Sequence, residues 1–320
     1  MNWFSFHFTD FALSFLSIIF EGIPFLLLGS LVSGAVEAFV PREVLARWLP
    51  KNYAAAIMVS ALMGLVLPMC ECASVVVIRR LIRKGLPLSC AVTYMMAAPI
   101  VSPVVALSTY VAFRGQGPLE MTLLRLVLGF LIAVGVGLAV RDIPPEKLLQ
   151  PAMLDSLPGR RRTGLSMAVA GDDAALNLAG GAAGVNGKLF RTVQSATSDF
   201  LDVTFFFVVG AAIASTFNTA VNQSLLAPVA TNPALSVMAM MVLAFMLAIC
   251  SSTNAFIAVS FRMFPPSAKL AFLLFGPLFD TKLFFLYGAV FRRWFVLSLG
   301  IGLFIVIALI CNHLGLILNS

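Results

Sequence analysis

The stretch that decides the fold of this chain is LPMCECASVVVIRRLIRKG, residues 67–85. It ends a long apolar run, which Pro68 interrupts just before two cysteines separated by one glutamate. A proline inside an apolar helix removes a backbone donor and breaks or kinks the helix. Non-helical backbone at membrane depth is tolerated only where it is buried in protein or lines a cavity. In a membrane protein, the pattern predicts a broken helix that presents Cys70, Glu71 and Cys72 to an enclosed cavity.

The composition around this stretch is that of an integral membrane protein. The chain has 320 residues, of which 60% are hydrophobic and 11% are charged, whereas soluble domains carry about 25% charged residues. Apolar side chains in such excess cannot all be buried in one soluble core, so many must face lipid. A water-soluble enzyme is therefore excluded. The net charge of +7 is explained by membrane orientation and does not indicate a nucleic-acid partner.

Eight apolar stretches are long enough to cross the hydrocarbon as helices. They cover roughly residues 11–40, 53–78, 86–113, 121–140, 200–222, 235–261, 270–291 and 294–312. Strand-like alternation is absent from these runs. The predicted fold class is an all-α integral membrane protein of about eight transmembrane helices, with helix breaks near the C-E-C and G-P-x-x-D-x-K segments.

A polar segment divides the chain into two halves. Residues 141–197 contain RDIPPEKLLQ, PGRRRTG and LAGGAAGVNG, which are typical of a partly flexible linker. We therefore expect a first transmembrane repeat at 1–140, a cytoplasmic linker at 141–197 and a second transmembrane repeat at 198–320.

The basic residues predict the orientation in the membrane. With eight full spans, the inner loops hold 13 Lys and Arg and the outer side holds seven, including Arg125 at a span edge. Both termini are therefore expected on the cytoplasmic side of a bacterial inner membrane, together with the linker. Arg42, Arg47 and Lys51 fall on the outer side in this layout, against the rule.

The two halves resemble each other in sequence. An offset of 178 residues aligns Cys72 with Cys250, Ser74 with Ser252, Pro87 with Pro265, Ser89 with Ser267 and Pro99 with Pro277. An offset of 181 aligns Glu21 with Asp202 and Gly29 with Gly210. Duplicated halves are common in transporters, where the substrate site lies at the repeat interface near the midplane. Four spans per half would make the repeats parallel, whereas a re-entrant hairpin at 86–113 would make them inverted.

Cys70, Glu71 and Cys72 form the first candidate site. Two thiolates and a carboxylate suit a soft metal or a metalloid. A glutamate inside the hydrocarbon is costly and indicates a function, either as a ligand or as a proton carrier. The alternative is that the cysteines are small apolar fillers and that Glu71 faces the aqueous rim.

The matching segment of the second half is CSSTNAF, residues 250–256. Its polar side chains either line the cavity opposite C-E-C or hydrogen-bond backbone carbonyls and hold helices together. The candidate cavity-lining residues are Cys250, Ser251, Ser252 and Asn254. If Cys250 lies opposite Cys70 and Cys72, three sulfurs suit a trivalent metalloid or a soft cation.

Further breaks supply candidates for coupling or gating. They lie in AAPIVSP, residues 97–103, in GPLFDTK, residues 276–282, and in the first span. An acid and a base two residues apart do not face each other on a regular helix, so either the helix unwinds after Pro277 or each finds its own partner, such as Lys282 with Glu71. Asp280 and Lys282 either belong to a buried structural ion pair, or Asp280 binds a coupling ion. The full set is Glu21, Pro68, Pro99, Ser102, Pro103, Pro277, Asp280 and Lys282.

Four motifs together resemble one family. They are P-M-C-E-C, R-R-L at Arg79–Leu81, Y-M-M-A-A-P-I-V-S-P at Tyr94–Pro103 and G-P-L-F-D-T-K. In these the chain resembles the predicted permease family that includes the YraQ and YcgR proteins and the organoarsenical exporter ArsP. The resemblance implies a polytopic inner-membrane permease with the C-x-C and G-P-x-x-D-x-K regions as hallmarks. Relatives usually carry Gly and Pro where this chain has Ala73 and Val76, and S-E-A-D-A-F where it has SSTNAF.

The leading hypothesis is a secondary transporter, not an enzyme, that needs no cofactor and lies among membrane lipids. It would export a soft, thiol-reactive solute such as a trivalent arsenical or a soft metal ion, with Cys70, Cys72 and Cys250 as ligands and Glu71 or Asp280 handling a proton. One alternative is a transmembrane thiol redox protein that uses Cys70 and Cys72 with a thioredoxin-like partner. Another is a structural subunit of a membrane complex, with a second subunit or further copies of itself as partners.

Overall fold

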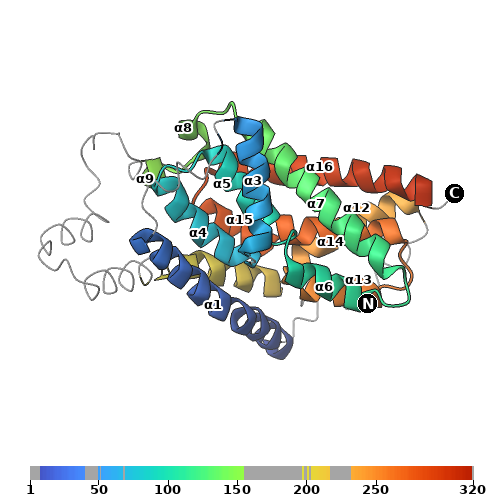
Figure 1. Ribbon diagram of the computed structural model, residues 1–320. Helices are drawn as coiled ribbons and strands as arrows, with labels where there is room; N and C mark the ends of the chain where they lie inside the picture. Colours follow the sequence, from blue (N-terminus) through green and yellow to red (C-terminus); the bar gives the residue numbers. More distant parts are fainter. Residues whose placement is uncertain are drawn as a thin grey trace, which may run out of the picture.

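The computed structural model describes residues 8–39, 50, 52–67, 69–154, 197, 200–201, 203–216 and 232–318. Regular structure in these ranges is helical, and one isolated bridge joins Leu149 to Phe291. Figure 1 shows the helices packed lengthwise against one another, with α1 lying across one side of the bundle. The predicted helical class is confirmed for this part of the chain.

The helices fall into two series. The first consists of α1 (Phe8–Phe39), α3 (Tyr53–Val66), α4 (Glu71–Arg83), α5 (Leu88–Ala97), α6 (Pro103–Ala112) and α7 (Pro118–Val140), followed by the short α8 (Pro145–Leu148) and α9 (Pro151–Leu154). The second consists of Val203–Thr216, α12 (Pro233–Leu247), α13 (Thr253–Ser260), α14 (Pro266–Leu278), α15 (Thr281–Gly288) and α16 (Arg293–Leu318).

Four segments are long and apolar enough to cross a membrane: Phe8–Gly34, Pro118–Val140, Pro266–Gly288 and Arg293–Gly315. The first is only 6% buried in the molecule, whereas the third, made of α14 and α15, is 89% buried. Large apolar side chains on α1, α7 and α16 point outward, as lipid-facing side chains do. The remaining helices are shorter, so the count of eight full spans stays a prediction.

The expected helix breaks are present. In the first series, α3 ends at Val66 and α4 begins at Glu71. In the second, α14 ends at Leu278, directly after Pro277, and α15 begins at Thr281. The two residues between α14 and α15 are extended, because Asp280 leaves helical geometry to cap the next helix.

The segment α3–α4 enters the bundle and returns. Gly64, near the end of α3, lies against Ala98 at the end of α5, and Ile57 and Thr93 both lie against Gly137 of α7. Thus α3 and α5 run in the same direction. Since a tight turn through Gly85, with φ +98°, joins α4 to α5, α4 runs in the opposite direction to α3.

The second series repeats this course. Ala244, near the end of α12, lies close to Gly276, near the end of α14, so α12 and α14 run in the same direction. The five residues 261–265 join α13 to α14. The segments α3–α4 and α12–α13 are called the first and the second hairpin below, and their tips are residues 67–70 and 248–252.

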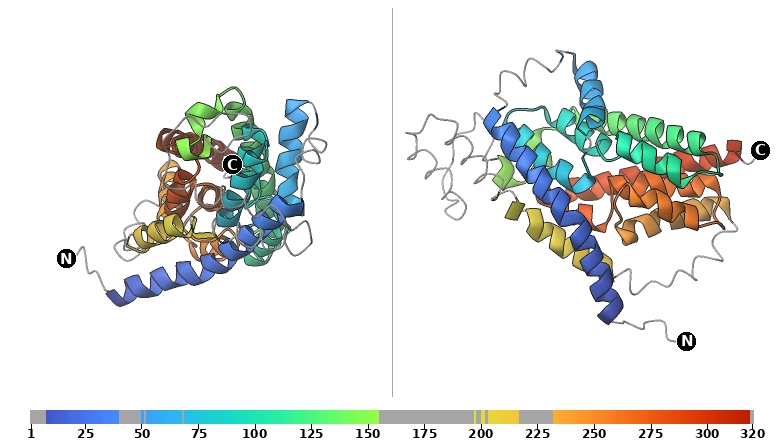
Figure 2. Two further views of the ribbon diagram at one scale, coloured as in Figure 1. Left: turned by 90° about the vertical axis from the view of Figure 1, so that its left-hand side faces the viewer. Right: turned by 60° about the horizontal axis from the view of Figure 1, so that its bottom comes forward.

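The last helices of the two series run antiparallel. The end of α7 lies beside the start of α16, because Arg292 N donates to Leu148 O at 2.8 Å, whereas Gly315 near the end of α16 lies against Ser267 at the start of α14. Leu154 therefore lies at the end of the molecule opposite to Leu318 (Figures 1 and 2). Eight full crossings would put these two points on the same side, whereas a chain whose two hairpins each return to the side from which they enter has them on opposite sides.

The first part of the expected linker is packed. Leu148 and Leu149 are buried, and Gln150 N donates to Val290 O at 3.0 Å. Residues 155–196 lie outside the described residues, and the domain boundaries stay a prediction.

Candidate functional site

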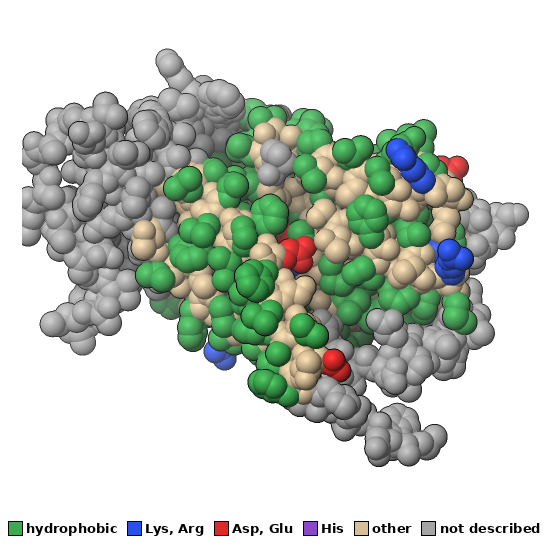
Figure 3. All heavy atoms as spheres, turned by 90° about the horizontal axis from the view of Figure 1, so that it is seen from below, with side chains coloured by type: hydrophobic (Ala, Val, Ile, Leu, Met, Phe, Trp, Pro, Cys, Tyr) green, Lys and Arg blue, Asp and Glu red, His purple; other side chains and the backbone are tan. Residues whose placement is uncertain are grey.

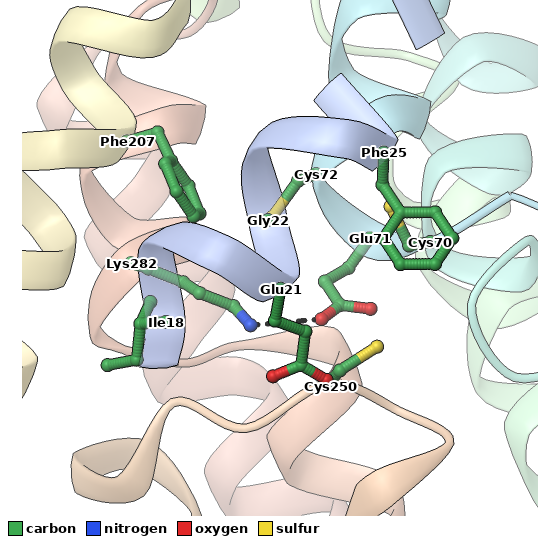
Figure 4. A pocket seen from close by; sticks show the side chains of 10 residues that line it. All are labelled: Ile18, Glu21, Gly22, Phe25, Cys70, Glu71, Cys72, Phe207, Cys250 and Lys282. Atoms are coloured by element: carbon green, nitrogen blue, oxygen red, sulfur yellow. Dashed lines mark hydrogen bonds and ion pairs between the residues drawn. The ribbon is translucent and has the colours of Figure 1, made fainter. Parts of the chain in front are cut away.

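A narrow pocket lies where the two hairpin tips meet α1 and α15 (Figure 4). Its lining combines apolar, thiol and charged side chains: Ile18, Glu21, Gly22, Phe25, Cys70, Glu71, Cys72, Phe207, Cys250 and Lys282. The free space within it is about that of a single water molecule. Helices from both series thus enclose one small, mixed polar and apolar site.

A buried ion pair crosses this pocket. Lys282 Nζ donates to Glu71 Oε1 at 3.0 Å and lies 3.6 Å from Asp280 Oδ2. The three side chains are at most 5% exposed. Glu71 Oε2 and Asp280 Oδ2 have no hydrogen-bond partner in the described part of the chain. Two carboxylates therefore share one ammonium, and each has an oxygen without a hydrogen bond that could accept a proton or a cation.

The two carboxylates, Glu71 and Asp280, lie at the starts of the helices that follow the breaks. Glu71 is the first residue of α4, and Asp280 caps α15 by accepting a hydrogen bond from Leu283 N at 2.7 Å. The exposed backbone N–H groups at a helix start stabilise a nearby carboxylate. The helix ends after Pro277, and Lys282 pairs with Glu71 as well as with Asp280.

Three free thiols line the same pocket. Cys70 caps α4, where its Sγ accepts from Ala73 N at 3.5 Å. Cys250 Sγ lies 3.7 Å from Ser252 Oγ. Figure 4 shows the three side chains around the pocket without their sulfur atoms converging on one point. Among the described residues, no three Cys, His, Asp or Glu side chains are grouped closely enough to hold a metal ion.

Glu21 brings α1 into the site. Its Oε1 accepts from Thr253 Oγ1 at 3.2 Å, which joins α1 to the start of α13. Figure 3 shows the face of the molecule seen from below as largely hydrophobic, with acidic atoms near its middle. Asp202, the predicted repeat partner of Glu21, lies outside the described residues.

The other predicted residues are placed around the pocket or away from it. Asn254 does not line it; its Nδ2 donates to Phe272 O at 3.3 Å and joins α13 to α14. Ser251 and Ser252 form part of the second tip. Pro99, Ser102 and Pro103 form the break between α5 and α6, and Pro277 lies inside α14. Pro68 lies outside the described residues.

Arg125 is the residue that the sequence analysis misplaced. It was assigned to a span edge, but its side chain is 1% exposed inside the bundle. Its Nη1 donates to Thr109 Oγ1 at 2.7 Å and its Nη2 to Ser251 O at 2.8 Å. The signal was available, because a single Arg stands seven residues after the start of a 23-residue apolar helix.

Known relatives match nearly the whole chain. Residues 7–319 match the ArsP_1 family, described as a predicted permease. The UPF0718 protein YcgR of Bacillus subtilis (strain 168) is 35% identical over 286 residues, which cover 89% of this chain and 90% of the relative. A protein of Streptococcus mutans, named "Putative two-component membrane permease complex subunit", is 28% identical over 289 residues, 89% of this chain and 88% of its own. No solved structure matches.

These matches confirm the family resemblance that rests on the C-E-C and G-P-L-F-D-T-K motifs. The relatives are matched over about nine tenths of their length, so the correspondence covers both helix series and the pocket between them. The chain is a multi-pass membrane protein and belongs to the ArsP_1 family of predicted permeases.

Proposed function

We propose that this protein is a secondary transporter that moves a small, soft, thiol-reactive solute through the pocket between the hairpin tips. The observation that carries the proposal is the lining of that pocket, in which Cys70, Cys72 and Cys250 surround the buried Glu71–Lys282 pair. Soft cations and trivalent metalloids prefer thiolate ligands. Ionisable groups inside a membrane bundle mark substrate or proton pathways.

The proposed transport mechanism rests on two inverted repeats. Helices α3–α7 and α12–α16 occur in the same order, and the last members of the two series run antiparallel. In this proposal each half crosses the membrane with its first helix, with a broken helix and with its last helix, and contributes one re-entrant hairpin. Inverted repeats of this kind bind substrate at the midplane and expose it alternately to the two sides.

The size and charge of the pocket limit the cargo. Space for about one water admits a bare metal ion or a small metalloid in this conformation, and an organic substituent requires the tips to separate. A positive cargo replaces the Lys282 ammonium at Glu71, and the ammonium stays paired with Asp280. When the cargo leaves, a proton on Glu71 or Asp280 takes the place of its positive charge. The coupling ion in this proposal is therefore a proton.

The surroundings of the transporter complete the proposal. We place it in the bacterial inner membrane, and the name of the streptococcal relative supports a second subunit as a partner. The function is transport and not catalysis, in line with the permease family.

A thermal-stability screen with soft ions tests the proposal. Silver(I), mercury(II) and arsenite are added to the detergent-purified wild type, to Cys70→Ser/Cys72→Ser, and to the control Cys90→Ser/Cys311→Ser, whose cysteines are buried away from the pocket. A ligand that binds the native state raises its melting temperature by mass action. We expect a rise of several degrees in the wild type and the control and none in the pocket variant.

Transport completes the test. The wild type in vesicles should move the ion that stabilises it, and Cys70→Ser/Cys72→Ser should not. Equal transport by both proteins would exclude the thiol pocket as the cargo site. A mixed disulfide of Cys70 or Cys72 with a thioredoxin-like protein, without any ion binding, would instead favour the redox function.

A further inference from the structure

Arg125 joins the first series to the tip of the second hairpin. It projects from α7, donates to Thr109 of α6, and donates to the backbone carbonyl of Ser251. Thr109 is fully buried and Ser251 is 3% exposed. The guanidinium is thus buried and links α6 and α7 of the first series to the tip of the second hairpin.

The charge of Arg125 is not balanced by an acid. No carboxylate among the described residues lies within ion-pair distance of it, and its Nε has no hydrogen-bond partner there. A buried cation in a membrane bundle is costly and is retained where it performs a role. Here the Thr109 hydroxyl of α6 and the Ser251 carbonyl of the second tip accept its hydrogen bonds, so the tip and the guanidinium depend on each other.

The two hairpin tips are held in the same manner. Glu71 stands between Cys70 and Cys72 at the first tip and accepts from Lys282 of the second series. Ser251 stands directly after Cys250 at the second tip and accepts from Arg125 of the first series. Each cysteine-bearing tip is therefore fastened by one buried cation that belongs to the opposite half.

We propose that Arg125 is a positioning residue that fastens the second hairpin tip and thereby keeps Cys250 in the pocket. It is the counterpart of Lys282 at the first tip. The acceptor chemistry makes the two contacts unequal: separating Lys282 from Glu71 breaks a buried ion pair, whereas releasing Ser251 breaks a hydrogen bond from a charged donor to a neutral carbonyl. The second tip is consequently the one that opens more readily.

Modification of individual cysteines measures this role directly. The full-length protein in detergent is treated with N-ethylmaleimide, and mass spectrometry gives a separate rate for each cysteine. In Arg125→Met, we expect the rate at Cys250 to rise about tenfold to a hundredfold, because a hydrogen bond to a charged group is lost. Cys90 and Cys311, which are buried elsewhere, should keep their rates.

Two further variants separate positioning from general stability. Arg125→Lys keeps the charge but offers one nitrogen for two acceptors, so its rate at Cys250 should be intermediate; it also decides the question if Arg125→Met fails to fold. Thr109→Val removes only the Nη1 acceptor and should raise the rate less than Arg125→Met. A uniform rise at all cysteines, or an unchanged rate at Cys250 in both Arg125 variants, would overturn the proposal.

The part of the inference that concerns cargo rests on the proposed function. Silver(I) should raise the melting temperature of Arg125→Lys less than that of the wild type, because Cys250 is less often in place. The maleimide rates are measured without any ion. If they change as expected while no soft ion binds the wild type, the positioning role stands and the proposed cargo is wrong.

Discussion

Lys282 is the residue on which the charge balance of the pocket depends. Its ammonium lies 3.0 Å from Glu71 and 3.6 Å from Asp280. Within the described part of the chain, Glu71 pairs with Lys282 alone, whereas Lys282 contacts both acids. Removing the lysine therefore leaves two buried carboxylates without a counter-charge, whereas neutralising Glu71 leaves no buried charge unpaired.

Substitutions of this pair should differ in cost. Breaking a buried ion pair on one side destabilises a protein by about 3–5 kcal/mol. We expect Lys282→Met to lose stability of that order and Glu71→Gln to lose less, because Lys282 keeps Asp280. The double variant Glu71→Gln/Lys282→Met should recover part of the loss. Thermal unfolding in detergent measures the order of these stability losses. The control is Arg293→Met at an exposed position, which should change stability by no more than about 0.5 kcal/mol. Equal losses in the two single variants would contradict this account.

At the scale of elements, α1 packs on α4 through a position that has no room for a side chain. A Cβ on Gly29 would lie 2.7 Å from the Cβ of Ala73 and 2.9 Å from its Cα. Ala73 follows Cys72 in the first turn of α4. The close approach of these two helices thus sets how tightly α1 covers the pocket.

Gly29→Ala should push α1 away from α4. Overpacking of this kind costs about 1–3 kcal/mol, and the displacement should speed maleimide modification of Cys72. Ala73→Gly, added to Gly29→Ala, should restore much of both properties because it removes the opposing methyl group. Gly135→Ala on α7 is the matched control, since nothing lies within 4 Å of its Cβ and alanine favours a helix by up to about 1 kcal/mol. A loss in Gly135→Ala as large as in Gly29→Ala would show that the contact does not matter.

The sequence predicts the positions of the elements better than their course. Breaks beside Pro277 and near C-E-C are local effects of proline and of capping side chains, so they can be read from a few residues. The direction of α3 relative to α5 depends on which faces of three helices meet, at Gly64, Gly137 and Ala98. Hydropathy does not encode such contacts, so the hairpin at 53–83 was expected as one broken span.

The same distinction applies to the site. Glu71, Asp280 and Lys282 were identifiable because a charge inside an apolar run is conspicuous. Arg125 is equally conspicuous, but the apolar run alone places it at a span edge, since the depth of a residue depends on where a helix starts. Phe207 and Gly22 line the pocket as ordinary apolar residues, and only the folded arrangement brings them there.

At the scale of the whole molecule, the basic residues gather at one end. In the described part of the chain, the end with the α4–α5 turn and the start of α16 holds Arg79, Arg80, Arg83, Lys84, Arg141, Lys147, Arg292 and Arg293, and the other end holds Arg114, Arg262 and Lys269. From the positive-inside rule we expect the first of these ends in the cytoplasm. The last helix ends at Leu318 near the mark C in Figure 1, at the other end, so this orientation has that point outside.

Cysteine labelling in intact cells checks this orientation. A membrane-impermeant maleimide should label Arg262→Cys, between α13 and α14, without permeabilisation. It should label Arg293→Cys, at the start of α16, only after permeabilisation. Both positions are exposed, and the native cysteines provide the background in the wild type. The reverse pattern would restore the expectation from eight full spans, in which residues 262–269 form an inner loop and Arg293 lies outside.

The burial of the segment Pro266–Gly288 has a consequence for biosynthesis. This segment is 89% enclosed by other helices and carries Asp280 and Lys282, whose insertion into lipid as an isolated helix is costly. It emerges from the ribosome after every residue of the first half, including Glu71, has been made. Its neighbours α4, α7 and α12 have been made by then, whereas α16 follows it. A ribosome that made the halves in the reverse order would present Lys282 to the membrane before Glu71, its ion-pair partner, had been made.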